Sequence, residues 1–183
     1  MIGIGGAAGL RAAAGFTRRE ARISDCGLYR YRLERWWDGQ FSGALHFVML
    51  NPSTADGRID DPTMRRVVGF ARRDGFSGAV VLNLFAMRAT DPAELARAAD
   101  PVGPENVHHL TRLLRDSALL GAPIVCAWGA HPIARIAARR FVAEARLERA
   151  RLCCLGRTKE MAPRHPLYVK AAQPLEFFDD GAQ

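Results

Sequence analysis

Residues 44–54 read Ala-Leu-His-Phe-Val-Met-Leu-Asn-Pro-Ser-Thr, an apolar run that stops at a polar turn. A short apolar run that ends at a turn signal is typical of a buried β-strand. Three further apolar runs, at residues 79–84, 123–127 and 152–155, alternate with segments of helical periodicity. Strands that alternate with helices form βαβ units, and these build a mainly parallel sheet with helices on both faces. We therefore expect the α/β class: a three-layer αβα domain with a mainly parallel, roughly four-stranded central sheet.

Turn and cap residues mark where the helices begin. Asp61 and Pro62 supply a carboxylate cap and a first-turn proline, so we expect a helix over residues 63–73 that Gly75 ends. The same signals predict a short helix after Asp91-Pro92 and longer ones over about residues 104–120 and 132–149. A further half-buried strand is predicted over residues 28–37, where aromatic side chains alternate with arginines.

Length and composition indicate one soluble domain. The chain has 183 residues, of which 49% are hydrophobic, enough for a single core. We expect residues 1–22 to form a poorly ordered N-terminal arm and residues 23–183 to form a single α/β domain. No apolar stretch is long enough to span a membrane. The four cysteines form no C-x-x-C pair, so we expect no bound metal and a reducing, cytoplasmic compartment.

The formal net charge is +7, and nearly all of the positive charge comes from arginine, because Lys159 and Lys170 are the only lysines. Solvated helix faces and a GC-rich genome explain such an excess. A polyanionic partner, nucleic acid first, explains it equally well, because guanidinium groups bind phosphate in bidentate fashion. Net charge alone does not choose between these explanations. The dinucleotide-binding and P-loop motifs are missing after the first strand, so we expect no nucleotide cofactor.

Ligands of parallel α/β sheets bind outside the carboxyl ends of the strands, so the loop after the first run is the first candidate site. Asn51 offers a carboxamide that can orient a water, and Pro52 stiffens the turn. The hydroxyl groups of Ser53 and Thr54 can donate to an anion. Three carboxylates within reach could act as general base, and the sequence leaves the choice open: Asp56, Asp60 and Asp61.

Two later loops add polar side chains at the same edge. Asn83 stands inside an apolar strand, where its amide either ties down a neighbouring loop or reads a ligand. Arg88 and Thr90 follow as phosphate or substrate contacts, or as part of a solvated loop. After the last strand, His165 stands between Arg164 and a proline, well placed to stabilise developing negative charge.

These segments together resemble a bacterial and phage family that is known only as a domain of unknown function, number 1643. The likeness covers nearly everything after residue 27, and it names no activity. It is carried by residues 48–56 (Val-Met-Leu-Asn-Pro-Ser-Thr-Ala-Asp), 61–63, 83–86, 88–92, 100–103, 126–131, 155–158 and 164–168.

A more distant likeness is to the uracil-DNA glycosylase superfamily, especially its mismatch-specific branch. Its first strand ends in Gly-Ile-Asn-Pro, whose asparagine positions the hydrolytic water, and Leu50-Asn51-Pro52 is similar. A later strand there ends in an asparagine that pairs with the extruded base, before an Arg- and Thr-rich stretch. Asn83, Arg88 and Thr90 look like that counterpart. His165-Pro166 resembles its closing His-Pro-Ser-Pro-like loop, so the resemblance makes Leu167 the apolar wedge that fills the emptied base stack.

The sequence thus supports a hydrolase of N-glycosidic bonds in DNA or in modified nucleotides. Base excision needs a flipped nucleotide, an amide that reads its edge, a water and a donor to the departing base. The alternative is a nucleic-acid or nucleobase-binding protein that lacks the chemistry. A purely structural protein ranks last, because it would leave the polar strand-end loops without purpose. Both leading hypotheses make nucleic acid or a nucleotide the expected partner, with no membrane.

Overall fold

The apolar run at residues 44–49 forms strand β3 (Ala44–Met49), which lies inside a seven-stranded sheet. The protein is described here by a computed structural model, which covers residues 15–39, 43–53 and 60–179. The strand order is β1-β2-β4-β3-β5-β6-β7. The other strands are β1 (Arg18–Ile23), β2 (Arg30–Trp36), β4 (Gly78–Asn83), β5 (Ile124–Cys126), β6 (Leu152–Cys154) and β7 (Glu176–Phe177).

The four predicted apolar runs are the four neighbouring strands β4, β3, β5 and β6, which pair in parallel. The prediction of about four strands in a mainly parallel sheet is nevertheless wrong for the sheet as a whole. Strand β2 adds to β4 in antiparallel fashion, β1 adds to β2, and β7 adds to β6, so the sheet is mixed. Apolar runs reveal only strands that helices bury, whereas β1 and β7 lie at the two edges with mostly exposed side chains.

Strand β1 also corrects the end of the predicted N-terminal arm. Arg18 to Arg22 fall inside residues 1–22, yet they pair with β2 from Trp36 to Arg32. Their sequence, Arg-Arg-Glu-Ala-Arg, shows no apolar alternation, because a solvated edge strand needs backbone pairing and not burial. Residues 1–14 of the arm lie outside the described residues.

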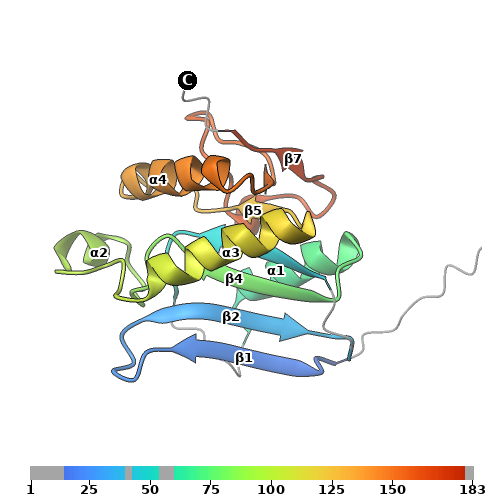
Figure 1. Ribbon diagram of the computed structural model, residues 1–183, viewed down its shortest axis with the longest axis horizontal. Helices are drawn as coiled ribbons and strands as arrows, with labels where there is room; N and C mark the ends of the chain where they lie inside the picture. Colours follow the sequence, from blue (N-terminus) through green and yellow to red (C-terminus); the bar gives the residue numbers. More distant parts are fainter. Residues whose placement is uncertain (1–14, 40–42, 54–59, 180–183) are drawn as a thin grey trace, which may run out of the picture.

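Helices cover both faces of the sheet, which confirms the α/β class and gives three layers. They are α1 (Pro62–Arg73), α2 (Ala93–Arg97), α3 (Asn106–Leu120), α4 (Ala134–Leu147) and a 3-10 turn, η1 (Pro166–Tyr168). Alternate β3 side chains point to opposite faces: Val48 belongs to the apolar cluster of α3 and α4, and Phe47 to that of α1. In Figure 1, α3 crosses in front of the sheet and α1 lies behind it.

Helix α1 begins as the sequence predicts, and its start fixes part of the site. Asp61 is the N-cap, and its Oδ1 accepts a hydrogen bond of 2.6 Å from the backbone N–H of Met64. Pro62 occupies the first turn, where its missing N–H leaves no bond unmade. Among the described residues, no helix combines the length and the apolar character that crossing a membrane requires.

Candidate functional site

A polar cavity of about 80 Å³ lies at the carboxyl edge of the sheet, where β3 and β4 end. Its polar lining consists of Arg30, Asn51, Ser53, Asp61, Thr63, Asn83 and His165. The side chains of Leu33, Met49, Met64, Val67 and Val81 make up its apolar part. The cavity therefore brings together four predicted site residues from three separate loops: Asn51, Ser53, Asn83 and His165.

The parallel register and loop pairing explain why these residues meet. Met49 and Asn83 are direct partners in the ladder, so β3 and β4 end side by side. The backbone N–H of Ala89 donates to the carbonyl of Pro52 at 3.0 Å, which ties the two following loops together. Residue 165 comes from a distant strand end, and Arg66 of α1 draws its loop in by donating to the carbonyl of Pro166.

The Asn51 amide is oriented by two backbone carbonyls. Its Nδ2 donates to the carbonyl of Ala89 at 2.8 Å and to that of Pro52 at 3.1 Å. No donor from the described residues reaches Oδ1. Because both N–H groups are used, the amide cannot turn over without losing them, and Oδ1 remains an acceptor at the cavity. A fixed acceptor of this kind can orient a water molecule.

Asn83 is buried, with 2% of its surface exposed, yet its Nδ2 has no hydrogen-bond partner among the described residues. A buried donor without a partner destabilises a fold by about 1–3 kcal/mol. Such groups are rare, and this one lines a cavity that a ligand could enter. The sequence left two roles open for the Asn83 side chain: anchoring a loop or reading a ligand. Here the loop after β4 is anchored by Asn106, whose Nδ2 donates to the carbonyls of Asn83 and Leu84.

His165 presents a neutral imidazole to the cavity. Its Nδ1 accepts a hydrogen bond of 3.3 Å from the backbone N–H of Leu167, so the ring proton lies on Nε2. Burial lowers the pKa of His165 below its ordinary value, and the charge of Asp61 opposes this only in part. The ring is therefore an N–H donor near neutral pH and carries no positive charge.

The three carboxylates proposed as general base differ in their surroundings. Asp60 lies 2.7 Å from Nε of Arg35, which is fully buried, and it pairs with that guanidinium away from the cavity. Asp61 lines the cavity while it caps α1, and its Oδ2 accepts a 2.9 Å bond from Ser53. Asp56 lies outside the described residues, as does Thr54. Among the described carboxylates, Asp61 alone lines the cavity.

Arg30 is a cavity residue that the sequence analysis did not select. It begins β2 with 4% of its surface exposed, and burial lowers its pKa to about 10. The carboxylate of Asp61 acts in the opposite direction and favours the charged form. The pattern of residues 28–37 predicts a half-buried strand but does not say which of its arginines are buried. The burial of Arg30 depends on the pairing of β2 with β4, which that pattern does not reveal.

The remaining predicted residues lie outside the cavity. Pro52 is buried beside it, and Arg88 donates to the carbonyl of Gly27. Thr90 is exposed, and Arg164 is exposed with its Nε bound to the carbonyl of Arg157. Leu167 is 38% exposed on η1. The described residues contain no group of three or more His, Cys, Asp or Glu side chains that could hold a metal ion.

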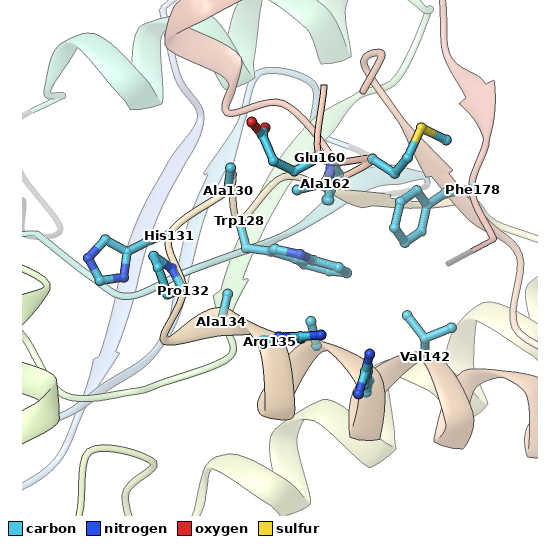
Figure 2. A pocket seen from close by; sticks show the side chains of 15 residues that line it. Trp128, Ala130, His131, Pro132, Ala134, Arg135, Val142, Glu160, Ala162 and Phe178 are labelled. Atoms are coloured by element: carbon cyan, nitrogen blue, oxygen red, sulfur yellow. The ribbon is translucent and has the colours of Figure 1, made fainter. Parts of the chain in front are cut away.

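A larger cleft of about 650 Å³ lies next to the cavity, between the start of α4 and the loop after β6. Figure 2 shows Trp128 along this cleft, with Arg135 and Val142 pointing toward it from α4 and Phe178 across from Val142. A Cβ atom on Gly129, which lines the cleft, would lie 3.9 Å from Cβ of His165, which lines the cavity. The two spaces are therefore neighbours at this sheet edge.

The fold and site define an α/β protein with two adjoining hollows at the carboxyl edge of a mixed sheet. The chain belongs to the family described as protein of unknown function DUF1643, whose model matches residues 30–167. The matched range contains the polar residues of the small cavity. No curated protein and no solved structure was found to match the chain.

Proposed function

We propose that this chain hydrolyses an N-glycosidic bond in DNA or in a modified nucleotide and releases a nucleobase. The observation that carries the proposal is that Asn51, Asn83 and His165 line one cavity. Each offers a different function: a fixed acceptor, a buried donor without a partner, and a neutral N–H donor. These are the groups that base excision needs for a water, a base edge and a departing base anion.

The reaction would run as follows. A water held by Oδ1 of Asn51 adds its oxygen to C1′ of the sugar, and the C1′–N bond breaks. The bonding electrons leave with the base, whose developing negative charge is stabilised by the Nε2–H of His165 and the nearby guanidinium of Arg30. The water hydrogen ends on the base nitrogen, so the products are a sugar with a C1′ hydroxyl and a neutral free base.

The size of the cavity limits what enters it. A volume of about 80 Å³ holds two or three waters at about 30 Å³ each. We propose that it takes the hydrolytic water and the polar edge of the base, which Nδ2 of Asn83 reads. These two roles match those of the corresponding residues in uracil-DNA glycosylases, and we propose a distant relationship to that superfamily. The proposal includes hydrolase activity, DNA binding and a cytoplasmic location.

The test is base release from a panel of oligonucleotides and nucleotides that carry damaged and phage-type modified bases. We expect Asn51→Ala and His165→Ala to lower the release rate by at least a hundredfold without unfolding the protein. His108→Ala, which removes an exposed histidine on α3, is the matched control and keeps the rate. If the unmodified protein releases no base from any member of the panel, the proposal is refuted.

A second candidate is a nucleobase-binding protein that performs no hydrolysis. The arrangement of Asp61 favours it, because both of its oxygens already accept hydrogen bonds, from Met64 and from Ser53. These two bonds stabilise the charged carboxylate of Asp61, the one described carboxylate at the cavity, and so make it a weaker base toward water. This candidate predicts salt-dependent binding of single-stranded DNA by the protein with no base release, and it fails if no binding is measured at low salt.

A further inference from the structure

The larger cleft beside the cavity has the size and chemistry of a ligand site of its own. Its volume of about 650 Å³ falls within the range of about 300–1,000 Å³ that is usual for small-molecule sites. None of the residues with a proposed role in base release lines it. Its occupant must therefore be recognised by other side chains, and two walls of contrasting character provide them.

One wall carries paired positive charge. Arg135 and Arg139 lie four residues apart on α4, so both side chains leave the same helix face, one turn apart, and both line the cleft. Both are exposed, and no carboxylate of the described residues forms an ion pair with either of them. Like charges at this spacing repel each other by about 0.2–0.5 kcal/mol. An anion in the cleft would relieve the repulsion and accept hydrogen bonds from both guanidinium groups.

The floor of the cleft is aromatic and aliphatic. Trp128 packs edge-to-face against Phe178, with ring centroids 5.6 Å apart, and Val142 of α4 completes this surface. Trp128, Phe178 and Val142 are only 2–5% exposed, so they form a rigid back to the cleft, and Met161, which is 59% exposed, adds apolar surface that a ligand can touch. A flat apolar group can lie against it while an attached anionic group reaches the arginines.

The one carboxylate of the cleft lies on its other side. Glu160 belongs to the loop after β6, and Figure 2 shows its carboxylate on the side away from α4. Its pKa is lowered, mainly by a hydrogen bond from its own backbone N–H, so it is charged near neutral pH. The cleft therefore has a positive wall and a negative wall, and an anionic group would bind at the α4 wall.

We infer that this cleft binds a nucleotide, with the phosphate on Arg135 and Arg139 and the sugar and base against the apolar lining that Met161 and the edge of Trp128 provide. A nucleotide combines a flat ring system with an anionic phosphate, the two kinds of group that the apolar lining and the paired arginines can bind. The choice of a nucleotide over other flat anions rests on the proposed function. Gly129 of the cleft lies beside His165 of the cavity. In a strand, the nucleotide in the cleft would therefore be adjacent to the nucleotide whose base is released in the cavity.

The test is binding and not catalysis, so that its outcome does not depend on base release. The probe is a fluorescein-labelled octamer of thymidylate, and thymidine monophosphate is the competitor. We expect Arg135→Ala/Arg139→Ala to raise Kd by at least tenfold. We also expect the double variant to reduce the salt dependence of log Kd by about 0.7, because the neutralisation of one phosphate of a single strand is lost.

The matched control is Arg140→Ala, an exposed arginine on the same helix that does not line the cleft. The inference is overturned if wild-type protein does not bind the octamer at low salt, if Arg135→Ala/Arg139→Ala binds it as tightly as the wild type, or if Arg140→Ala weakens binding as much as the double variant does. Competition by the monophosphate identifies a free nucleotide as a sufficient ligand, and failure to compete identifies a nucleotide within a strand. Binding that depends on Arg135 and Arg139 in a protein that releases no base from the panel would support the cleft and refute the proposed function, so the two failures give different results.

Discussion

Replacing Asn83 with leucine should make the protein more stable, although the site is buried in the core of the sheet. The side chain is 2% exposed, and its Nδ2 has no partner among the described residues. Such a donor destabilises the fold by about 1–3 kcal/mol, which leucine removes. Leucine has the same number of side-chain heavy atoms as asparagine, and the adjoining cavity of about 80 Å³ leaves room for its slightly larger methyl groups, so little overpacking follows. We expect the free energy of unfolding to rise by about 1 kcal/mol.

Asn106→Leu is the matched control, because it is the same substitution at a buried asparagine whose Nδ2 is bonded, while only its Oδ1 lacks a partner among the described residues. Nδ2 of Asn106 donates to the carbonyls of Asn83 and Leu84 at 3.0 and 3.1 Å. Leucine would remove both bonds and leave two buried carbonyls short of a donor. We expect the free energy of unfolding to fall by about 2 kcal/mol, the opposite sign to that at Asn83.

Urea denaturation followed by circular dichroism measures both changes, provided that the slope of each transition matches that of the wild type. If Asn83→Leu destabilises the protein as much as Asn106→Leu does, Nδ2 of Asn83 is satisfied in the folded protein. The interpretation of Asn83 as a ligand-reading donor would then be wrong. A stabilised variant that also loses binding of the octamer or release of a base would show that stability is given up at this position for function.

Two further predictions concern packing and pH. A Cβ on Gly78 would lie 2.4 Å from the ring of Trp36, so Gly78→Ala should lower the free energy of unfolding by about 1–3 kcal/mol and lower Tm with it. A Cβ on Gly69 of α1 would have nothing within 4 Å, so Gly69→Ala should raise the free energy of unfolding by about 0.5–1 kcal/mol. Burial, and next the charge of Arg32, lower the pKa of His46 from 6.5 to about 4. The folded state therefore binds fewer protons than the unfolded chain between these values, and stability that is complete above pH 6.5 is lost as the pH falls toward 4, by about 3 kcal/mol in total. Urea titrations at several pH values should show this loss in the wild type and a smaller one in His46→Phe; equal losses in both would contradict the assignment.

The sequence was most informative where burial and capping are local. The apolar runs located β3 to β6 because each of these strands is covered on both faces. Asp61-Pro62 located the start of α1, since a cap acts on its own helix. The edge strands β1 and β7 were not predicted, because backbone pairing holds their residues and produces no hydrophobic pattern in the sequence.

The residues of the candidate site also fall into those that the sequence predicted and one that it did not. Asn51, Ser53, Asn83 and His165 were selected because each follows or ends a strand, and parallel strands place such positions at one edge. Arg30 was not selected, since its burial at the cavity depends on an antiparallel strand whose partner is distant in sequence.

The four apolar runs and the turn Asn51-Pro52-Ser53 were enough to predict the class of fold and the sheet edge at which the candidate cavity lies. Those properties follow from local burial and from the common direction of parallel strands. Only the tertiary structure decided which amide is fixed by carbonyls, which buried donor lacks a partner, and which nitrogen of His165 carries the proton. Each of these depends on a hydrogen-bond partner in three dimensions: for Asn51 it is Ala89, which is 38 residues away in the chain.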